Sequence, residues 1–270
     1  MLDRPFAPSV PTKDPLPDFF SKESYGRHSG VFSSFAYARA SLPPGPEFDR
    51  EALAEEYVDV RAKKVFAYDY PVMWWLNAAF AKGAASVLDI GGSVGVHYYA
   101  YQGYFDMPEA LTWRVVEVST MVSIGQELAV KNGAHALTFE EDLEPVIAST
   151  AHDVWISAGA IQFLDDARPD ELLKRCIVRP KHILLNKLPL YHGEDFVTTQ
   201  NIGHGSFAPL HVYNRARLIR DIRLLGYTLR DWWAVHERSM DIPGHPERSF
   251  PTFSGLYFVD NATLGASQRT

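Results

Sequence analysis

The segment Ser86–Tyr99, SVLDIGGSVGVHYY, constrains the fold of this chain more than any other stretch. Val87, Leu88 and Ile90 form a short apolar run of β-forming residues that ends at glycines, which is typical of a buried strand. The residues after Gly95 fit the first turns of a helix. A strand, a glycine-rich turn and a helix N-terminus together present free backbone N–H groups at the carboxyl end of the strand. The segment therefore predicts a nucleotide-type site in an α/β fold.

The acid in this segment indicates what kind of nucleotide the site takes. Asp89 stands two residues before the first glycine, in the spacing D-x-G-G-x-x-G, which differs from the G-x-G-x-x-G of dinucleotide-binding turns. A carboxylate at this position repels a pyrophosphate but suits a ligand that carries an ammonium group. The alternative is an ordinary strand-turn-helix in which Asp89 is merely solvated.

The stretch Asp89–Gly95 resembles motif I of the class I S-adenosylmethionine (SAM)-dependent methyltransferases, Asp/Glu-x-Gly-x-Gly-x-Gly. Ser93 replaces the middle glycine of that motif. The resemblance implies that SAM is the cofactor and that the motif residues hold it, namely Asp89, Gly91, Gly92, Ser93 and Gly95.

Glu117 is the second signal for this cofactor. It lies near the end of the next expected strand, 22 residues after Gly95. An acid about 20 residues beyond the glycines holds the ribose hydroxyls in dinucleotide folds, because a carboxylate accepts both O–H donors. Methyltransferases use the same device, so the resemblance assigns Glu117 to the ribose of SAM. An exposed glutamate at a strand end is the alternative.

Three further residues are expected beside the cofactor. Asp142 follows the third expected strand, where the family often contacts the adenine amino group, although Glu140 and Glu141 compete with it and a solvated acidic turn is equally consistent. Ser157 and Gln162 belong to a segment of small residues after the fourth strand that resembles the one beside the methionine portion of SAM. Gln162 either reaches the cofactor or caps the following turn.

The chain has 270 residues, a net charge of −7 and a single cysteine. The negative charge argues against a nucleic-acid partner, and the lone cysteine excludes a disulfide framework and a cysteine metal site. No signal peptide and no run of 18 apolar residues is present in the sequence, so we expect a cytoplasmic protein that neither spans nor binds a membrane. No spacing of His, Asp or Glu predicts a metal site.

We expect three parts in the chain. Residues 1–46 form a Pro-rich and aromatic arm, whose segment 25–40 should pack on something as a lid or partner contact; residues 47–83 form helices packed on the core; residues 84–265 form the methyltransferase domain. Strand and helix patterns alternate after residue 86, which implies a parallel sheet. Five parallel strands and a C-terminal antiparallel pair match the Rossmann-like, seven-stranded, mostly parallel sheet of class I methyltransferases, with helices on both faces.

The elements can be placed by residue range. Strands are expected at 87–90, 113–118, 136–139, 153–157, 182–186, 227–236 and 252–259, and helices at 47–60, 70–83, 96–100, 120–132, 169–177 and 214–225. The apolar helix at 70–83 should be buried, with Trp74 and Trp75 in the core.

The segment 186–214 is expected to be a long polar and aromatic link beyond the fifth strand, on the side of the sheet where ligands bind. It should shape the acceptor pocket together with the N-terminal aromatic segment, and its candidate substrate residues are Tyr191, Gln200 and Tyr213. A hydroxyl acceptor needs a general base, for which His211 and His204 are the candidates; each is also consistent with a structural or surface histidine.

The chain further resembles a group of bacterial putative methyltransferases that are associated with surface-polysaccharide gene sets. The resemblance rests on residues 30–35, 89–95, 186–189, 226–227, 232–233 and 255–258. The N-methyltransferase signature Asn/Asp-Pro-Pro-Tyr/Phe is absent, which favours O-methylation of a small molecule or saccharide. Two alternatives remain open: an NAD(P)-dependent sugar-modifying oxidoreductase, and a non-catalytic SAM-binding partner protein. The acceptor and the oligomeric state are not predicted.

Overall fold

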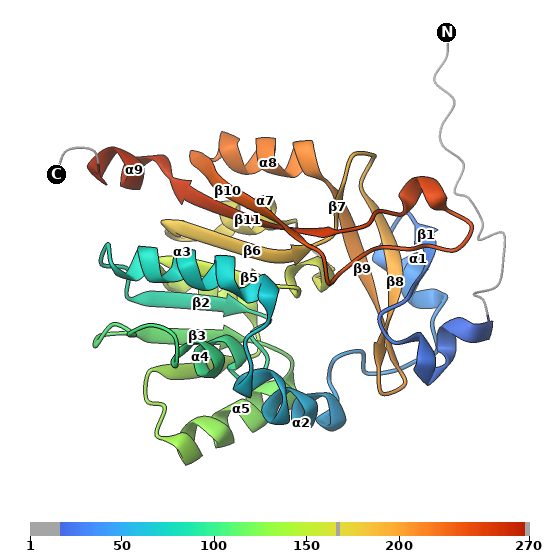
Figure 1. Cartoon of the computed structure of the whole chain (residues 1–270), viewed down its shortest axis with the longest axis horizontal. Coiled ribbons are helices and arrows are strands. Elements are labelled where there is room, and N and C mark those ends of the chain that lie inside the picture. The colour runs from blue at the N-terminus through green and yellow to red at the C-terminus, as the bar shows by residue number, and fades with distance from the viewer. Residues whose placement is uncertain (1–16, 166–167, 268–270) are drawn as a thin grey trace, which may run out of the picture.

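The computed structural model describes residues 17–165 and 168–267, and a seven-stranded sheet forms its centre (Figure 1). The strand order is β10 (Tyr227–Val235), β11 (Phe253–Asp260), β6 (His182–Leu188), β5 (Val154–Ala158), β2 (Ser86–Ile90), β3 (Thr112–Val116) and β4 (Leu137–Glu140). The strands from β6 to β4 pair in parallel, whereas β11 pairs antiparallel with both β6 and β10. The predicted fold class is confirmed, including the C-terminal antiparallel pair.

Helices cover both faces of this sheet. One face packs against α3 (Tyr70–Phe80), α4 (Val96–Tyr101) and α5 (Ser119–Asn132), and the other against α6 (Leu143–Ser149), α7 (Pro169–Arg175) and α8 (Arg215–Leu224). The sequence predicted all of these helices except α6. Asn214 caps α8 as expected, because its side chain accepts a hydrogen bond from the backbone N–H of Arg217.

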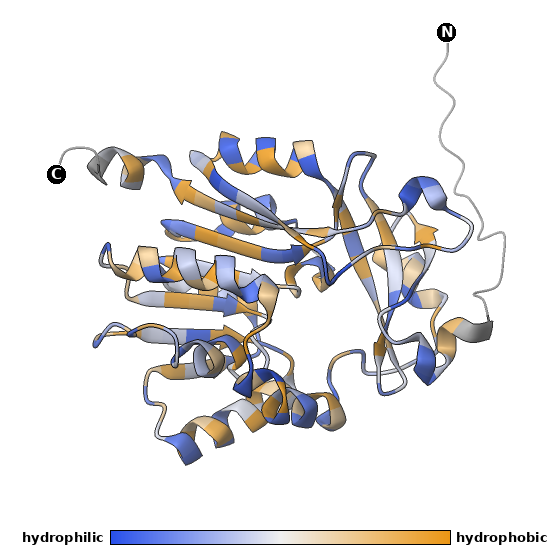
Figure 2. Cartoon of the chain, in the orientation of Figure 1, coloured by the Kyte–Doolittle hydropathy of each residue, from blue (hydrophilic) through white to orange (hydrophobic). Residues whose placement is uncertain are grey.

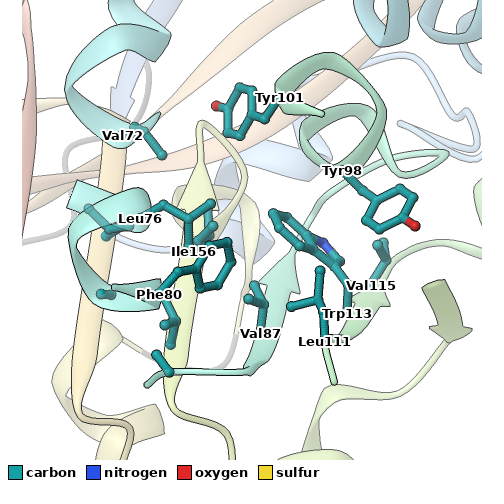
Figure 3. Close-up of a cluster of buried hydrophobic side chains, with 14 of the residues drawn as sticks. Val72, Leu76, Phe80, Val87, Tyr98, Tyr101, Leu111, Trp113, Val115 and Ile156 are labelled. Atoms are coloured by element: carbon teal, nitrogen blue, oxygen red, sulfur yellow. The ribbon is translucent and has the colours of Figure 1, made fainter. Parts of the chain in front are cut away.

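The central strand β2 shows how the sequence divides the core between the two faces. Val87 belongs to the cluster under α3, and Leu88 and Ile90 belong to the cluster on the opposite face. Side chains of a strand alternate between faces, so this short apolar run is buried on both sides. Figure 3 shows the first cluster, in which Leu76 and other α3 side chains lie over the strands. In Figure 2 the middle of β6 is hydrophobic, and α8 alternates between hydrophobic and hydrophilic residues.

A second, four-stranded sheet stands beside the first (Figure 1). Its order is β1 (His28–Phe32), β8 (Phe196–Gly203), β9 (Ser206–Asn214) and β7 (Leu190–Tyr191). The segment 186–214, which was expected to be a long polar and aromatic link, is therefore mostly strand, and none of its strands beyond the fifth was predicted from the sequence. The run FVTTQNIG in β8 is rich in β-branched residues, and the turn GHG then joins it to β9, which together make a hairpin signal.

The N-terminal region lies against this second sheet. β1 pairs with β8, which confirms that the aromatic segment 25–40 packs on another element, and α1 (Phe35–Ala40) follows. α2 (Glu51–Asp59) fills most of the helix expected at 47–60. Residues 1–16 of the predicted arm lie outside the described part.

The remaining elements are short. They are the 3-10 helices η1 (Pro17–Phe20), η2 (Lys22–Ser24), η3 (Arg61–Lys63), η4 (Ala67–Asp69), η5 (Ile161–Phe163) and η6 (Pro246–Arg248), and the C-terminal α9 (Asn261–Ser267). Within 17–165 and 168–267, no helix has both the length and the apolar character needed to cross a membrane.

The predicted core position of the tryptophan pair is correct for one residue only. Trp75 stacks on Tyr257 at 4.5 Å and donates a hydrogen bond of 2.8 Å to Asp231. Trp74 is 68% exposed, because neighbouring residues on a helix point in different directions and only one side of α3 meets the sheet.

Candidate functional site

A cavity of about 770 Å³ opens at the carboxyl ends of the parallel strands and reaches the second sheet. Its walls come from the turn after β2, from Glu117 after β3, from Ala158–Ala160 at the end of β5, from Lys187 on β6 and from Gln200 on β8. Open α/β sheets bind ligands at this edge, and the volume is in the range of small-molecule sites. The strand ends therefore bring together residues that are far apart in the sequence.

Gly91 and Gly92 in the turn after β2 have no room for a side chain. Gly91 has a φ of +72°, and a Cβ placed on it would lie 1.9 Å from the Cβ of Ala160. A Cβ on Gly92 would meet the carboxylate of Asp89 at 2.5 Å. Ser93, which replaces the middle glycine of the motif, still adopts the left-handed conformation, with a φ of +54°. Gly91, Gly92 and Ser93 line the cavity, whereas Gly95 packs against Leu137 behind it.

Glu117 lies in the cavity wall directly after β3. Its two carboxylate oxygens accept hydrogen bonds from the backbone N–H groups of Ser93, at 3.0 Å, and Val118, at 2.9 Å. Burial raises the pKa of Glu117 to about 7, the charges of Asp89 and Asp49 add to this effect, and the two N–H groups oppose it. The carboxylate is therefore fixed in place, close to the glycine turn and ready to accept further donors.

Asp89 does not face the cavity. Its side chain is fully buried, with its oxygens 2.9 and 3.0 Å from Nδ1 of His97. Trp113 donates to the same carboxylate through Nε1 at 3.2 Å. The sequence predicted a direct contact between Asp89 and a ligand ammonium. The structure does not support this contact, because the buried carboxylate is hydrogen-bonded to His97 and Trp113. His97 lines the cavity in its place, and Asp89 orients it.

The three other predicted cofactor residues have different surroundings. Asp142 lines the cavity and caps α6 by accepting from the N–H of Glu144 at 3.1 Å. Gln162 lines the cavity, and its Oε1 is buried with no partner among residues 17–165 and 168–267. Ser157 is behind the wall, where its hydroxyl donates to the carbonyl of Ile90 and accepts from the N–H of Ile161. Ser157 therefore positions the segment and does not contact the space itself.

Of the predicted substrate residues, the structure brings one to the cavity. Gln200 lines it, together with Tyr25 from the N-terminal segment. Tyr191 is buried and receives a hydrogen bond of 2.7 Å from Arg248, and Tyr213 is only 1% exposed. These two tyrosines belong to the packing of the second sheet.

The two candidate general bases are both outside the described cavity lining. His211 is held between the rings of Phe35, at 4.4 Å, and Tyr213, at 5.6 Å, and burial lowers its pKa. His204 lies in the β8–β9 turn, 3.0 Å from the carboxylate of Glu56. The geometry gives each histidine a structural or surface setting, which was the alternative interpretation of the sequence.

Sequence reasoning missed Lys187, which lies at the end of β6 with a φ of +54°. Its Nζ is 5.0 Å from the ring centre of Tyr68. A Cβ placed on Gly159 would come within 2.9 Å of its Cε. The pKa of Lys187 is lowered to about 8, chiefly by burial; the charge of Asp69 opposes this effect, and the charges of Arg238 and Arg61 add to it. The strand-end rule that identified Glu117 would also have identified this lysine.

Comparison with known proteins gives the fold and no more. No family model and no curated protein matches the sequence. Among solved structures, a putative S-adenosylmethionine-dependent methyltransferase from Listeria monocytogenes aligns with a TM-score of 0.51 and 14% identity, over 72% of this chain and 97% of that one. The [4+2]-cyclase SpnF aligns with a TM-score of 0.50 and 12% identity, over 86% and 98%.

A third solved structure is the 1,6-didemethyltoxoflavin-N1-methyltransferase of Burkholderia thailandensis with bound 1,6-didemethyltoxoflavin and S-adenosylhomocysteine (SAH). Its TM-score is 0.47 at 15% identity, over 81% of this chain and 92% of that one. Because the cyclase SpnF and the Listeria structure both align with this chain, the fold does not identify the reaction, which has to be argued from the site. The chain has the Rossmann-like fold of SAM-dependent methyltransferases.

Proposed function

We propose that this chain is a SAM-dependent methyltransferase that methylates a hydroxyl oxygen of a small molecule or saccharide. The observation that carries the proposal is the anchored carboxylate of Glu117 beside the glycine turn. Two backbone N–H groups fix its orientation, and each oxygen retains lone pairs for a ribose hydroxyl. A dinucleotide also has a ribose, so the remainder of the cavity must distinguish the two ligands.

The other end of the cofactor would lie along the glycine turn and the small residues Ala158–Ala160. Gln162 supports this placement, because its buried Oε1 lacks a partner within the described part of the chain and would accept from the ammonium of the methionine portion. His97 has its Nδ1 occupied by Asp89, which leaves Nε2 for a polar group of the ligand. This set of groups suits an amino acid better than a second nucleotide.

When bound, SAM supplies an electrophilic methyl group on a sulfonium centre. The task of the chain is to hold an acceptor hydroxyl in line and to take its proton. We propose that Nζ of Lys187 accepts this proton. The side chain of Lys187 lies beside Gly159, which belongs to the segment that we place next to the methionine portion. With a pKa of about 8, about one lysine in ten is neutral at pH 7. A general base works best when its pKa lies near the operating pH, and the pKa of Lys187 meets this condition.

The test is calorimetric titration of the purified protein with SAH, with NAD and NADP as controls. We expect SAH to bind with a micromolar Kd and both dinucleotides to give no heat. Dinucleotide binding without SAH binding would support the oxidoreductase alternative and overturn the proposal. SAH binding that Glu117→Ala leaves unchanged would overturn the ribose assignment.

A further inference from the structure

Two arginines lie in the cavity wall close to Lys187. Arg61 comes from η3 and Arg238 from the segment after β10, and both side chains line the cavity around Tyr68. Arg61 donates to the hydroxyl of Tyr68 at 2.8 Å, and the ammonium of Lys187 is over the same ring. Both arginines lower the pKa of Lys187 by charge repulsion, so the three cations act on one part of the cavity.

The two arginines differ from the other arginines of the wall, which have carboxylate partners. Arg39 pairs with Glu47 at 2.7 Å and with Asp165 at 2.9 Å, and Arg175 pairs with Glu144. Arg61 has the phenol of Tyr68 as its hydrogen-bond partner, and the guanidinium of Arg238 has no hydrogen bond or ion pair within the described part of the chain.

The carboxylate with the largest charge effect on Lys187, that of Asp69, already has hydrogen-bond partners. Asp69 accepts from the backbone N–H of Phe66 at 2.9 Å and from the hydroxyl of Tyr101 at 3.3 Å. It opposes the effect of the arginines on Lys187 but gives neither arginine an ion pair of 4.0 Å or less. Partly buried cations without a counter-charge are costly, which favours an anion that arrives with the ligand.

We propose that Arg61 and Arg238 bind an anionic group, a carboxylate or a phosphate, on the methyl acceptor. Guanidinium groups bind both anions through paired, charge-assisted hydrogen bonds. An acceptor held at this arginine pair presents a hydroxyl to the neighbouring Lys187. The inference rests on the proposed function, because it takes the half of the cavity around Glu117 as the cofactor site. It narrows the acceptor from any small molecule or saccharide to an anionic one.

The experiment measures anion binding to the SAH-saturated protein at fixed ionic strength. Inorganic phosphate and malonate are the two probes, so the stronger response identifies a phosphoryl or a carboxylate acceptor. We expect one of them to bind and its Kd to weaken about tenfold in Arg238→Gln and in Arg61→Gln, since each variant removes a charge-assisted hydrogen bond. Arg223→Gln, at an exposed position on α8, is the matched control and should bind like the wild type.

The SAH affinity of every variant is measured in parallel. Unchanged SAH binding in Arg238→Gln with weakened anion binding supports the inference, and Arg238→Lys should recover part of the loss. If neither anion binds the SAH-loaded wild type, or if Arg238→Gln and Arg223→Gln respond alike, the inference is overturned while the proposed function stands. Failure of the wild type to bind SAH contradicts the proposed function instead.

Discussion

The pKa of Glu117 makes cofactor affinity depend on pH. The free carboxyl has a pKa of about 7, because burial disfavours its charge. The ionised form accepts both ribose hydroxyls, so ligand binding should lower this pKa and release a proton near neutral pH. Affinity for SAH therefore falls as the pH falls through 7 and levels off above it.

The size of this effect follows from the fraction of ionised carboxyl. With a pKa of about 7, about one carboxyl in eleven is ionised at pH 6 and about ten in eleven at pH 8. The Kd for SAH should therefore be about tenfold weaker at pH 6 than at pH 8, which corresponds to about 1.4 kcal/mol. Glu117→Gln keeps the size but removes the charge. It should cost about 2 kcal/mol at pH 8, or about 30-fold in Kd, and should abolish this pH dependence.

The assay is calorimetric titration with SAH at pH 6, 7 and 8 on the wild type, Glu117→Gln and Glu171→Gln. Glu171 is on α7 and pairs with Lys174 at 2.6 Å, so its variant is a control for the loss of one acid away from the cavity. Any pH dependence that remains in Glu117→Gln comes from other groups that titrate between pH 6 and pH 8. The difference between the wild type and this variant therefore isolates the effect of Glu117. A wild-type Kd that does not change from pH 6 to pH 8, or a slope that persists in Glu117→Gln, would refute the reasoning.

Three further predictions concern the base, the turn and the histidines. Lys187→Met should lower kcat by about 10²–10³-fold with little change in SAH affinity. The wild-type rate should rise with pH through about 8, because the amine loses its proton there. A Lys187→Met variant that keeps its rate would exclude the lysine as the base. Gly91→Ala should lower the free energy of unfolding by about 3 kcal/mol, because its φ is left-handed and the new Cβ would lie 1.9 Å from Ala160. Gly103→Ala is the control and should be nearly neutral, since a Cβ there has no atom within 4 Å. Urea denaturation measures both. His204→Ala should leave turnover within about twofold and cost about 0.5 kcal/mol or less, because its pair with Glu56 is exposed; a large loss of rate would restore it as a catalytic candidate.

The sequence predicted the central sheet well because its signals are local. The apolar run of β2 ends at glycines, and the later strands and helices alternate at regular intervals, so the order of elements follows directly. The position of Glu117 in the cavity wall could be predicted from the order of the strands, because the carboxyl ends of parallel strands meet at one edge of the sheet. The predicted cap at Asn214 depended only on residues within one helical turn.

The rest of the site depends on contacts that sequence spacing does not encode. The carboxylate of Asp89 is used by His97 and Trp113, which only tertiary packing brings to it. Arg238 comes from the C-terminal part of the chain and Arg61 from before the sheet, so no local motif links them. His211 lies on β9, where side chains face alternate sides of the sheet, and His204 lies in the β8–β9 turn, so spacing in the sequence did not tell which of them would reach the cavity.

The most direct test of this account is a crystal structure of the protein with bound SAH. The account predicts the ligand in the cavity at the strand ends, with both ribose hydroxyls about 3 Å from the carboxylate of Glu117 and the amino-acid portion beside Gln162. A ligand outside this cavity, or a ribose that makes no contact with Glu117, would contradict it.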